Sequence, residues 1–187
     1  MSQEELITIY SEATPNPESM KFVLSRMILP NDSADFRVKE KTADAPLAAA
    51  LFELPYVNGV FIMNNFVSVT RVPGVDWLEA GPVLKDFIKS YIESGKPILN
   101  PKKTISEDDL GTIENKIKKL LDEYVKPAVE MDGGAIDFKS FEKGVVTVQM
   151  KGSCSGCPSS TMTLKSGIEN LLKRMVPEVE AVEAESV

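Results

Sequence analysis

The chain has 187 residues, of which 43% are hydrophobic, and a formal net charge of −7 at pH 7. This length accommodates one medium domain or two small ones. The acidic balance argues against a nucleic-acid-binding protein, since no basic stripe is available to neutralise phosphates. No stretch approaches the ~20 apolar residues of a transmembrane helix, so we expect no membrane partner.

The first residues, Met1-Ser2-Gln3-Glu4-Glu5, carry no targeting signal that we recognise. They lack the basic region of a secretory signal peptide and the arginine-rich pattern of a transit peptide. We therefore expect a cytoplasmic protein. The alternative is a mitochondrial matrix protein whose presequence is missing from the chain given.

Residues 1–94 alternate strand and helix patterns. The predicted strands are 6–10, 20–24, 60–63 and 66–70, and the predicted helices are 46–54 and 77–94. Thr14-Pro15-Asn16-Pro17 has the composition of a turn between the first two strands. Asn64-Asn65 is typical of a two-residue hairpin turn between the last two.

A linker is predicted at residues 95–104, where Gly95 can end a helix and Pro97 and Pro101 prevent its continuation. Ser106-Glu107-Asp108-Asp109 then has the pattern of a capping box at the start of a new helix. We therefore expect an N-terminal domain at 1–94 and a C-terminal domain at 105–187, both small and of the α+β class.

The C-terminal domain is predicted to run helix, hairpin, thiol loop, helix. An amphipathic helix is expected over 109–130, with Pro127 kinking or shortening it, and Asp132-Gly133-Gly134 should end it. A hairpin over 135–141 and 145–150 follows, then a helix over 161–175 and an edge strand over 179–183.

The loop between the hairpin and the last helix holds the chain's two cysteines, Cys154 and Cys157, in a C-x-x-C. We expect Ser159, Ser160 or Thr161 to cap the helix that follows, so the thiols lie near a helix N-terminus, which favours thiolate. Because the chain has no histidine, any soft-metal or redox chemistry must use these two thiols. Mechanisms of the Ser-His-Asp or Cys-His type are excluded, and we expect no enzyme activity.

The number of ligands narrows the possible functions of the two thiols further. An iron-sulfur cluster or a structural zinc usually takes four protein ligands, and one chain offers two thiols. Two copies offer four, so a shared site implies a dimer. From the residues alone, four interpretations stay open: a shared cluster, a shared zinc, a thioredoxin-like dithiol, and two buried cysteines without a role.

The sequence around the thiols resembles the C-terminal domain of NifU and of Nfu-type iron-sulfur carriers. The resemblance lies in 152–160, in Thr163-Leu164-Lys165-Ser166-Gly167-Ile168-Glu169 and in Met131-Asp132-Gly133-Gly134. Residues 14–22, 60–61 and 66–70 are similar to the N-terminal domain of Nfu proteins. Ala135 departs from the family, which usually has an acidic residue there, and residues 25–45 resemble nothing we can name.

This resemblance implies a scaffold or carrier that binds a [4Fe-4S] cluster through Cys154 and Cys157 of two subunits. It implies cluster transfer to apo iron-sulfur proteins as acceptors, an upstream cluster-assembly machinery as donor, and a homodimer on cluster binding. Exchange of one thiolate ligand at a time would make such a shared site labile.

Overall fold

The computed structural model describes residues 6–100, 112–155 and 158–186, and the chain divides into two compact units, 1–101 and 102–187. The predicted capping box at 106–109 and residues 101–104 of the predicted linker lie outside the described residues. Within the described ranges, no helix is both long and apolar enough to cross a membrane. The α+β class predicted from the sequence is confirmed.

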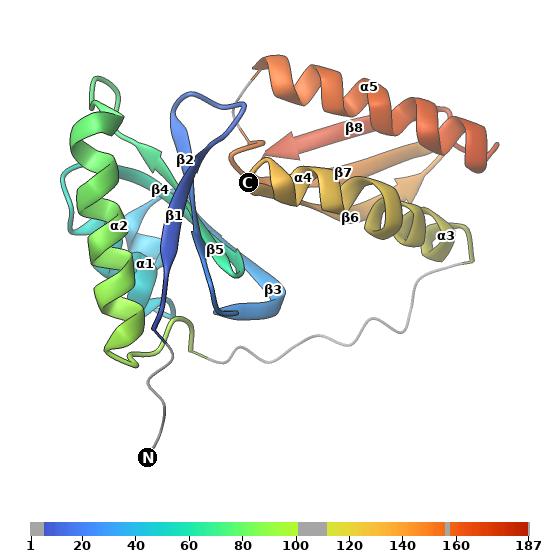
Figure 1. Cartoon of the computed structure of the whole chain (residues 1–187). Helices are drawn as coiled ribbons and strands as arrows, with labels where there is room; N and C mark the ends of the chain where they lie inside the picture. Colours follow the sequence, from blue (N-terminus) through green and yellow to red (C-terminus); the bar gives the residue numbers. More distant parts are fainter. Residues whose placement is uncertain (1–5, 101–111, 156–157, 187) are drawn as a thin grey trace. The chain divides into compact units, whose positions relative to one another are not determined.

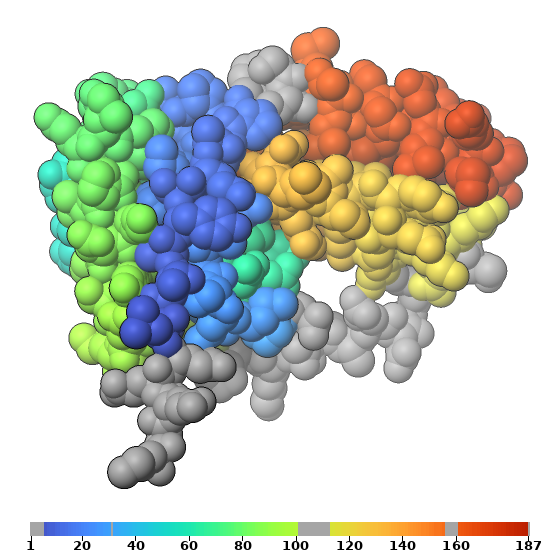
Figure 2. Space-filling view, in the orientation of Figure 1, coloured from blue at the N-terminus to red at the C-terminus, as the bar shows by residue number. Residues whose placement is uncertain are grey.

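The first unit is a five-stranded antiparallel sheet with helices (Figure 1). Its strand order is β1-β2-β5-β4-β3, and its elements are β1 (Ile9–Ala13), β2 (Ser19–Leu24), β3 (Leu29–Phe36), the 3-10 turn η1 (Lys39–Lys41), α1 (Pro46–Phe52), β4 (Val57–Asn64), β5 (Phe66–Arg71) and α2 (Trp77–Glu93). The exposed side of α2 is visible in green in Figure 2.

The core of the first unit lies between the sheet and the helices. The strand residues in this core alternate along the sequence, because every second side chain of a strand points to the same face of the sheet. Phe22, Val67 and Val69 face α1 and α2, where Leu51 and Leu84 are fully buried. The predicted hairpin is confirmed: Met63 pairs with Phe66, so Asn64 and Asn65 make the turn, and Asn64 has the positive φ of 47° that such turns need.

Two strands of this sheet differ from the prediction. The first was predicted at 6–10 but runs from Ile9 to Ala13, because pairing with β2 recruits the polar residues that follow Ile9. The strand β3 was not predicted at all. Its register shifts between Leu29 and Ser33, and Pro30 falls within the shift, so the sequence lacks the alternation of a strand. Such an irregular, proline-containing strand is tolerated at a sheet edge.

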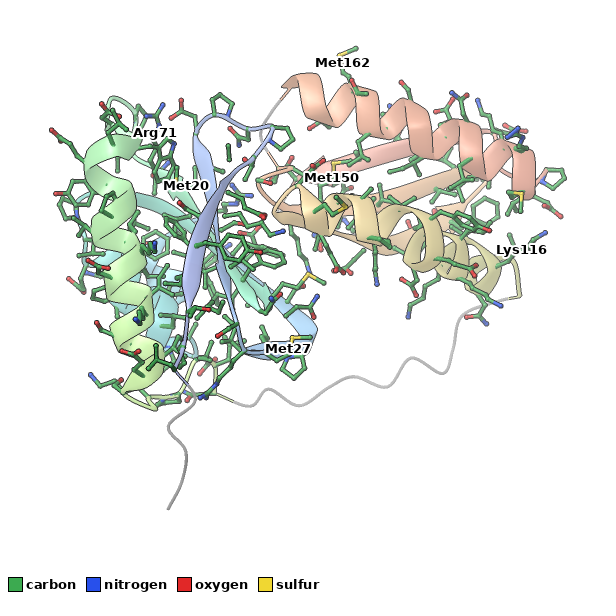
Figure 3. The ribbon with its side chains drawn as sticks, viewed as in Figure 1. Met20, Met27, Arg71, Lys116, Met150 and Met162 are labelled. Carbon is green, nitrogen blue, oxygen red and sulfur yellow. The ribbon has the colours of Figure 1, made fainter. Side chains whose placement is uncertain are left out.

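Arg71 ties the turn before β2 to the start of α2 (Figure 3). Its guanidinium makes two hydrogen bonds to Glu18, at 3.1 and 3.2 Å, donates to the carbonyl of Val75, and lies 5.7 Å from the Trp77 ring centroid. The Trp77 indole N–H donates to the carbonyl of Pro17 at 3.0 Å. These contacts attach the predicted turn at 14–17 to the start of α2.

The second unit is a three-stranded sheet, β6-β7-β8, with helices. Its elements are α3 (Thr112–Leu120), the π-helical turn η2 (Leu121–Val125), α4 (Lys126–Met131), β6 (Gly134–Glu142), β7 (Val145–Gly152), α5 (Pro158–Met175) and β8 (Ala181–Ser186). Ile136, Val146, Val148, Met150 and Val182 of the sheet share one apolar cluster with residues of α3, α4 and α5.

Pro127 has the predicted effect on the first helix of this unit. A proline has no N–H for the helix ladder, and its ring collides with the carbonyl four residues earlier. The chain adapts with the π turn η2 directly before it, and α4 then restarts with Pro127 in its first turn. The predicted end at Asp132-Gly133-Gly134 is also confirmed, because Gly133 takes a φ of 80° after the C-cap Asp132.

The last strand completes the sheet. It was predicted as an edge strand over 179–183; it is an edge strand, but it begins at Ala181 and runs parallel to β7. A parallel pair requires a crossover, and α5 provides it. Glu169 of α5 accepts hydrogen bonds from the Val182 backbone at 3.1 Å and from Lys173 at 2.6 Å, and these bonds lower the pKa of Glu169.

We predict that Arg71→Ala lowers the stability of the first unit by about 1–2 kcal/mol. The ion pair with half-exposed Glu18 contributes little on its own, so the loss comes from the Val75 hydrogen bond and the Trp77 stacking. Trp77 is the only tryptophan, so its fluorescence during urea denaturation reports on this unit alone. Arg26→Ala, at an exposed position, is the control, and equal midpoints for both variants would contradict the assignment.

Candidate metal centre

Three segments of the second unit meet at the turn that carries Cys154. The end of α4 supplies Asp132-Gly133-Gly134, β7 leads into the turn 152–155, and α5 returns past it. Gly134 pairs with Gly152 in the sheet register. The two cysteines of the motif therefore follow a strand and precede a helix, as predicted.

Hydrogen bonds hold the turn against its neighbours. The Ser153 N–H donates to the Gly133 carbonyl at 3.3 Å, and the Ser153 hydroxyl donates to the Asp132 carbonyl. The Ser155 N–H donates to the Gly152 carbonyl at 3.1 Å, which closes the turn. On the other side, the Thr161 hydroxyl donates to the Cys154 carbonyl at 3.3 Å. The turn is thus tied both to the end of α4 and to the first part of α5.

Gly134 lies so close to Cys154 that it has no room for a side chain. A Cβ at position 134 would lie 2.8 Å from the Cys154 Sγ and 2.7 Å from the Lys151 carbonyl oxygen. Contacts shorter than 3.0 Å force a displacement, and here one of the two atoms belongs to the backbone. The need for glycine at 134 is therefore steric, whereas Gly133 is needed for its positive φ.

Cys154 is buried, with 4% of its surface exposed, and it belongs to the apolar cluster of the second unit. The sequence placed Cys154 on a loop, and the structure adds that this loop is packed against the apolar core, so the thiol is not presented to solvent. The physical reason is that the turn folds back onto Gly134. Because Gly134 has no side chain, the Cys154 side chain can pack directly against its backbone. Cys157 and Gly156 lie outside the described residues.

The helix after the motif begins earlier than predicted. Because α5 starts at Pro158, Ser159, Ser160 and Thr161 lie inside it, and the prediction that one of them caps it is wrong. Proline is favoured in the first turn of a helix, where its missing N–H would have no partner in the helix. The start of α5 thus follows Cys157 directly in the sequence.

The donor set of one chain is small. Over residues 6–100, 112–155 and 158–186, no group of three or more His, Cys, Asp or Glu side chains could hold a metal ion. The chain contains two cysteines and no histidine. A four-thiolate cluster therefore fits this site only if a second chain contributes its own pair.

Comparison with known proteins places the chain in a family. Residues 117–183 match the model described as "NifU-like domain", and residues 9–95 match that described as "Scaffold protein Nfu/NifU N terminal". NifU-like protein 4, mitochondrial, of Arabidopsis thaliana is 38% identical over 192 residues, covering 98% of this chain and 68% of that protein. This chain belongs to the Nfu-type family of NifU-like proteins.

A second relative agrees with this assignment. The NFU1 iron-sulfur cluster scaffold homolog, mitochondrial, of Drosophila sechellia is 40% identical over 181 residues, which cover 94% of this chain. The chain spans 64% of the length of that relative. A solved NifU-like protein of Saccharomyces cerevisiae aligns with 55% of this chain and 92% of its own, at 21% identity and a TM-score of 0.48.

We predict that Gly134→Ala exposes the Cys154 thiol. Overpacking of this kind typically costs 1–3 kcal/mol, and about 1.4 kcal/mol corresponds to a tenfold change in an equilibrium. In a Cys157→Ser background, Cys154 should therefore react with a chromogenic disulfide reagent about tenfold faster when Gly134 is alanine. When position 134 is glycine, this reaction should be slow because Cys154 is buried.

Gly167→Ala is the matched control for this experiment. Gly167 lies within α5, and a Cβ there would meet no atom within 4 Å. That substitution should leave the reaction rate of Cys154 unchanged and stabilise the helix by about 0.5–1 kcal/mol. Equal rates for the two alanine variants would show that Gly134 does not restrain the thiol.

Proposed function

We propose that this chain is a carrier that holds an iron-sulfur cluster through Cys154 and Cys157 of two copies and passes it to apo-proteins. The observation that carries the proposal is the donor set: one pair of thiols and no histidine, in a chain of the Nfu-type family. The name of the Drosophila relative, an iron-sulfur cluster scaffold homolog, supports it. Four thiolates suit a [4Fe-4S] cluster, which is the cargo that the resemblance to Nfu-type carriers implies.

The cluster is a substrate of this protein and not a resident catalyst. Each copy contributes half of the ligands, so neither copy completes the coordination shell alone and cluster binding is coupled to assembly. An acceptor with its own cysteines can replace the carrier's thiolates one at a time, and no bond in an organic substrate is made or broken. The role that we propose is therefore non-enzymatic.

Loading requires the turn 152–155 to open. Cys154 exposes 4% of its surface, so its sulfur becomes accessible only when the turn separates from Gly134. In the apo carrier the Cys154 thiol is thus protected from solvent. In the loaded carrier the Cys154 sulfur bonds to the cluster instead of packing against Gly134. We propose that this difference helps to limit loss of the unloaded thiol to oxidation.

The compartment is part of the same proposal. A reducing environment suits a C-x-x-C that binds metal. We expected the cytoplasm from the first residues, with the mitochondrial matrix as the alternative. The Arabidopsis and Drosophila relatives are both named as mitochondrial proteins, which supports the alternative.

We predict that Cys154→Ser and Cys157→Ser each abolish stable cluster binding. After anaerobic reconstitution with iron and sulfide, the wild-type chain should become brown, bind about four irons per two chains and sediment as a dimer. Each serine variant should lose most of its iron and remain a monomer, because two of the four ligands are lost per dimer. Ser11→Ala, at an exposed position of β1 in the first unit, is the control.

The same experiment separates the competing functions. A thioredoxin-like dithiol would be colourless and would reduce disulfides catalytically, and a zinc-bridged protein would be colourless and would be monomerised by chelators. A single serine variant that keeps a full cluster would contradict the shared site.

We further propose that residues 1–94 select partners, that 95–104 link the domains and that 105–187 carry the cluster. Each unit has a separate apolar core, and the two cysteines belong to the second. A fragment of residues 104–187 is therefore predicted to bind as much iron per chain as the whole protein, but to transfer it more slowly to an acceptor enzyme because docking surface is lost. A folded fragment that binds no iron would refute this division.

A further inference from the structure

Two exposed methionines adjoin residues that are hydrogen-bonded to the turn that carries Cys154. Met131, the last residue of α4, is 76% exposed, and Met162, in the first part of α5, is 72% exposed. Both are large apolar side chains in water, although the same unit buries Met150 almost completely. Figure 3 shows Met162 pointing away from α5 at the end where that helix begins, whereas Met150 lies inside the unit.

Each of these methionines adjoins a residue that is bonded to the turn. Met131 directly precedes Asp132, whose carbonyl accepts from the Ser153 hydroxyl. Met162 directly follows Thr161, whose hydroxyl donates to the Cys154 carbonyl at 3.3 Å. The end of α4 and the beginning of α5 lie at the same end of this unit (Figure 1). Two exposed apolar residues on two different helices therefore lie one position along the chain from residues bonded to the thiol turn.

We propose that Met131 and Met162 form the contact surface for a second copy of this chain when the two copies share a cluster. The inference rests on the proposed function. Two copies that each supply two thiolates to one cluster must bring their thiol turns together, and a twofold axis places the same patch of both subunits at the interface. The residues that border the turn are then the first to meet their counterparts.

The size of the patch explains why the contact depends on the cluster. A stable protein interface buries about 800 Å² per partner, far more than two methionine side chains can supply. The patch is therefore too small to hold two apo chains together, but it adds apolar burial once the cluster has joined them. Methionine also suits a contact that must form and dissolve, since its flexible thioether adapts to irregular surfaces.

A hollow beside Met162 adds a feature that a partner can fill. Its volume is about 450 Å³, and Lys165, Ser166, Glu169 and Asn170 line it together with Met162. A protruding apolar side chain next to a shallow polar hollow is the arrangement of an interface anchor and its rim. Met162 belongs to the lining of this hollow and directly follows Thr161, the residue of α5 that bonds to the thiol turn.

The test is the dimer dissociation constant of the full-length, cluster-loaded chain, measured by sedimentation over a dilution series. The double variant Met131→Gln/Met162→Gln keeps side-chain length and helix propensity but removes the apolar surface. Its loaded dimer should dissociate about 10- to 100-fold more readily than the wild type, which is the effect expected when several methionines lose their burial. Iron per chain should be unchanged at high protein concentration.

Two further variants make the result specific. Met131→Leu/Met162→Leu preserves apolar surface and should keep the wild-type constant within about threefold, within the usual tolerance for a hydrophobic swap of similar volume. Met175→Gln alters an exposed methionine, 42% exposed, at the opposite end of α5. It should leave the constant unchanged.

Three outcomes would overturn the proposal. An unchanged dissociation constant in the glutamine double variant refutes the interface while leaving the proposed function intact. The same unchanged constant together with slower cluster transfer assigns the patch to acceptor proteins instead of a second copy. A wild-type chain that takes up no iron refutes the proposed function, and the interface fails with it.

Discussion

The second unit is organised by the close approach of the Gly134 backbone to the turn 152–155. This contact joins the end of α4, the first residue of β6, the last residue of β7 and the thiol of Cys154. It is possible because position 134 has no side chain, and position 133 is free to take the positive φ that redirects the chain after the helix. A substitution at Gly134 would therefore displace the thiol directly, whereas one at Gly133 would act on it through the backbone.

The same approach has an energetic consequence. Because Cys154 belongs to the apolar cluster, the state with a buried thiol is stabilised by packing, and a ligand must compete with that packing. Metal–thiolate bonds are strong enough to do so, since structural metal binding commonly contributes on the order of 10 kcal/mol or more. A carrier benefits from this competition, because the protein recovers its own packing when it releases the cluster.

The two units differ in how they are held together. In the first, a guanidinium and an indole tie a proline-containing turn to the N-terminus of α2, and the sheet is covered by helices that bury aliphatic side chains. In the second, backbone contacts between glycine-containing segments position the thiol, and a carboxylate at Glu169 ties α5 to β8. Side chains thus make the key connections of the first unit, and backbone contacts make those around the thiol turn of the second.

The sequence by itself determined the α+β class, most elements and the donor set of the candidate site. Hairpins at Asn64-Asn65 and Lys143-Gly144, the helix end at Gly133 and the effect of Pro127 all follow from local backbone rules, so they can be read without knowledge of distant contacts. The donor set of two thiols follows from composition alone. The irregular strand β3, the start of β1 and the parallel placement of β8 depend on which strand lies alongside, and local patterns do not contain that information.

The tertiary structure alone decided the environment of Cys154. Its burial depends on Gly134, twenty residues earlier in the chain, and on the hydrogen bonds of Ser153 and Thr161 to and from neighbouring segments. The exposure of Met131 and Met162 is likewise a property of how two helices are placed around one turn. Sequence patterns report which residues offer metal ligands, but the accessibility of those ligands is set by contacts between segments that only folding brings together.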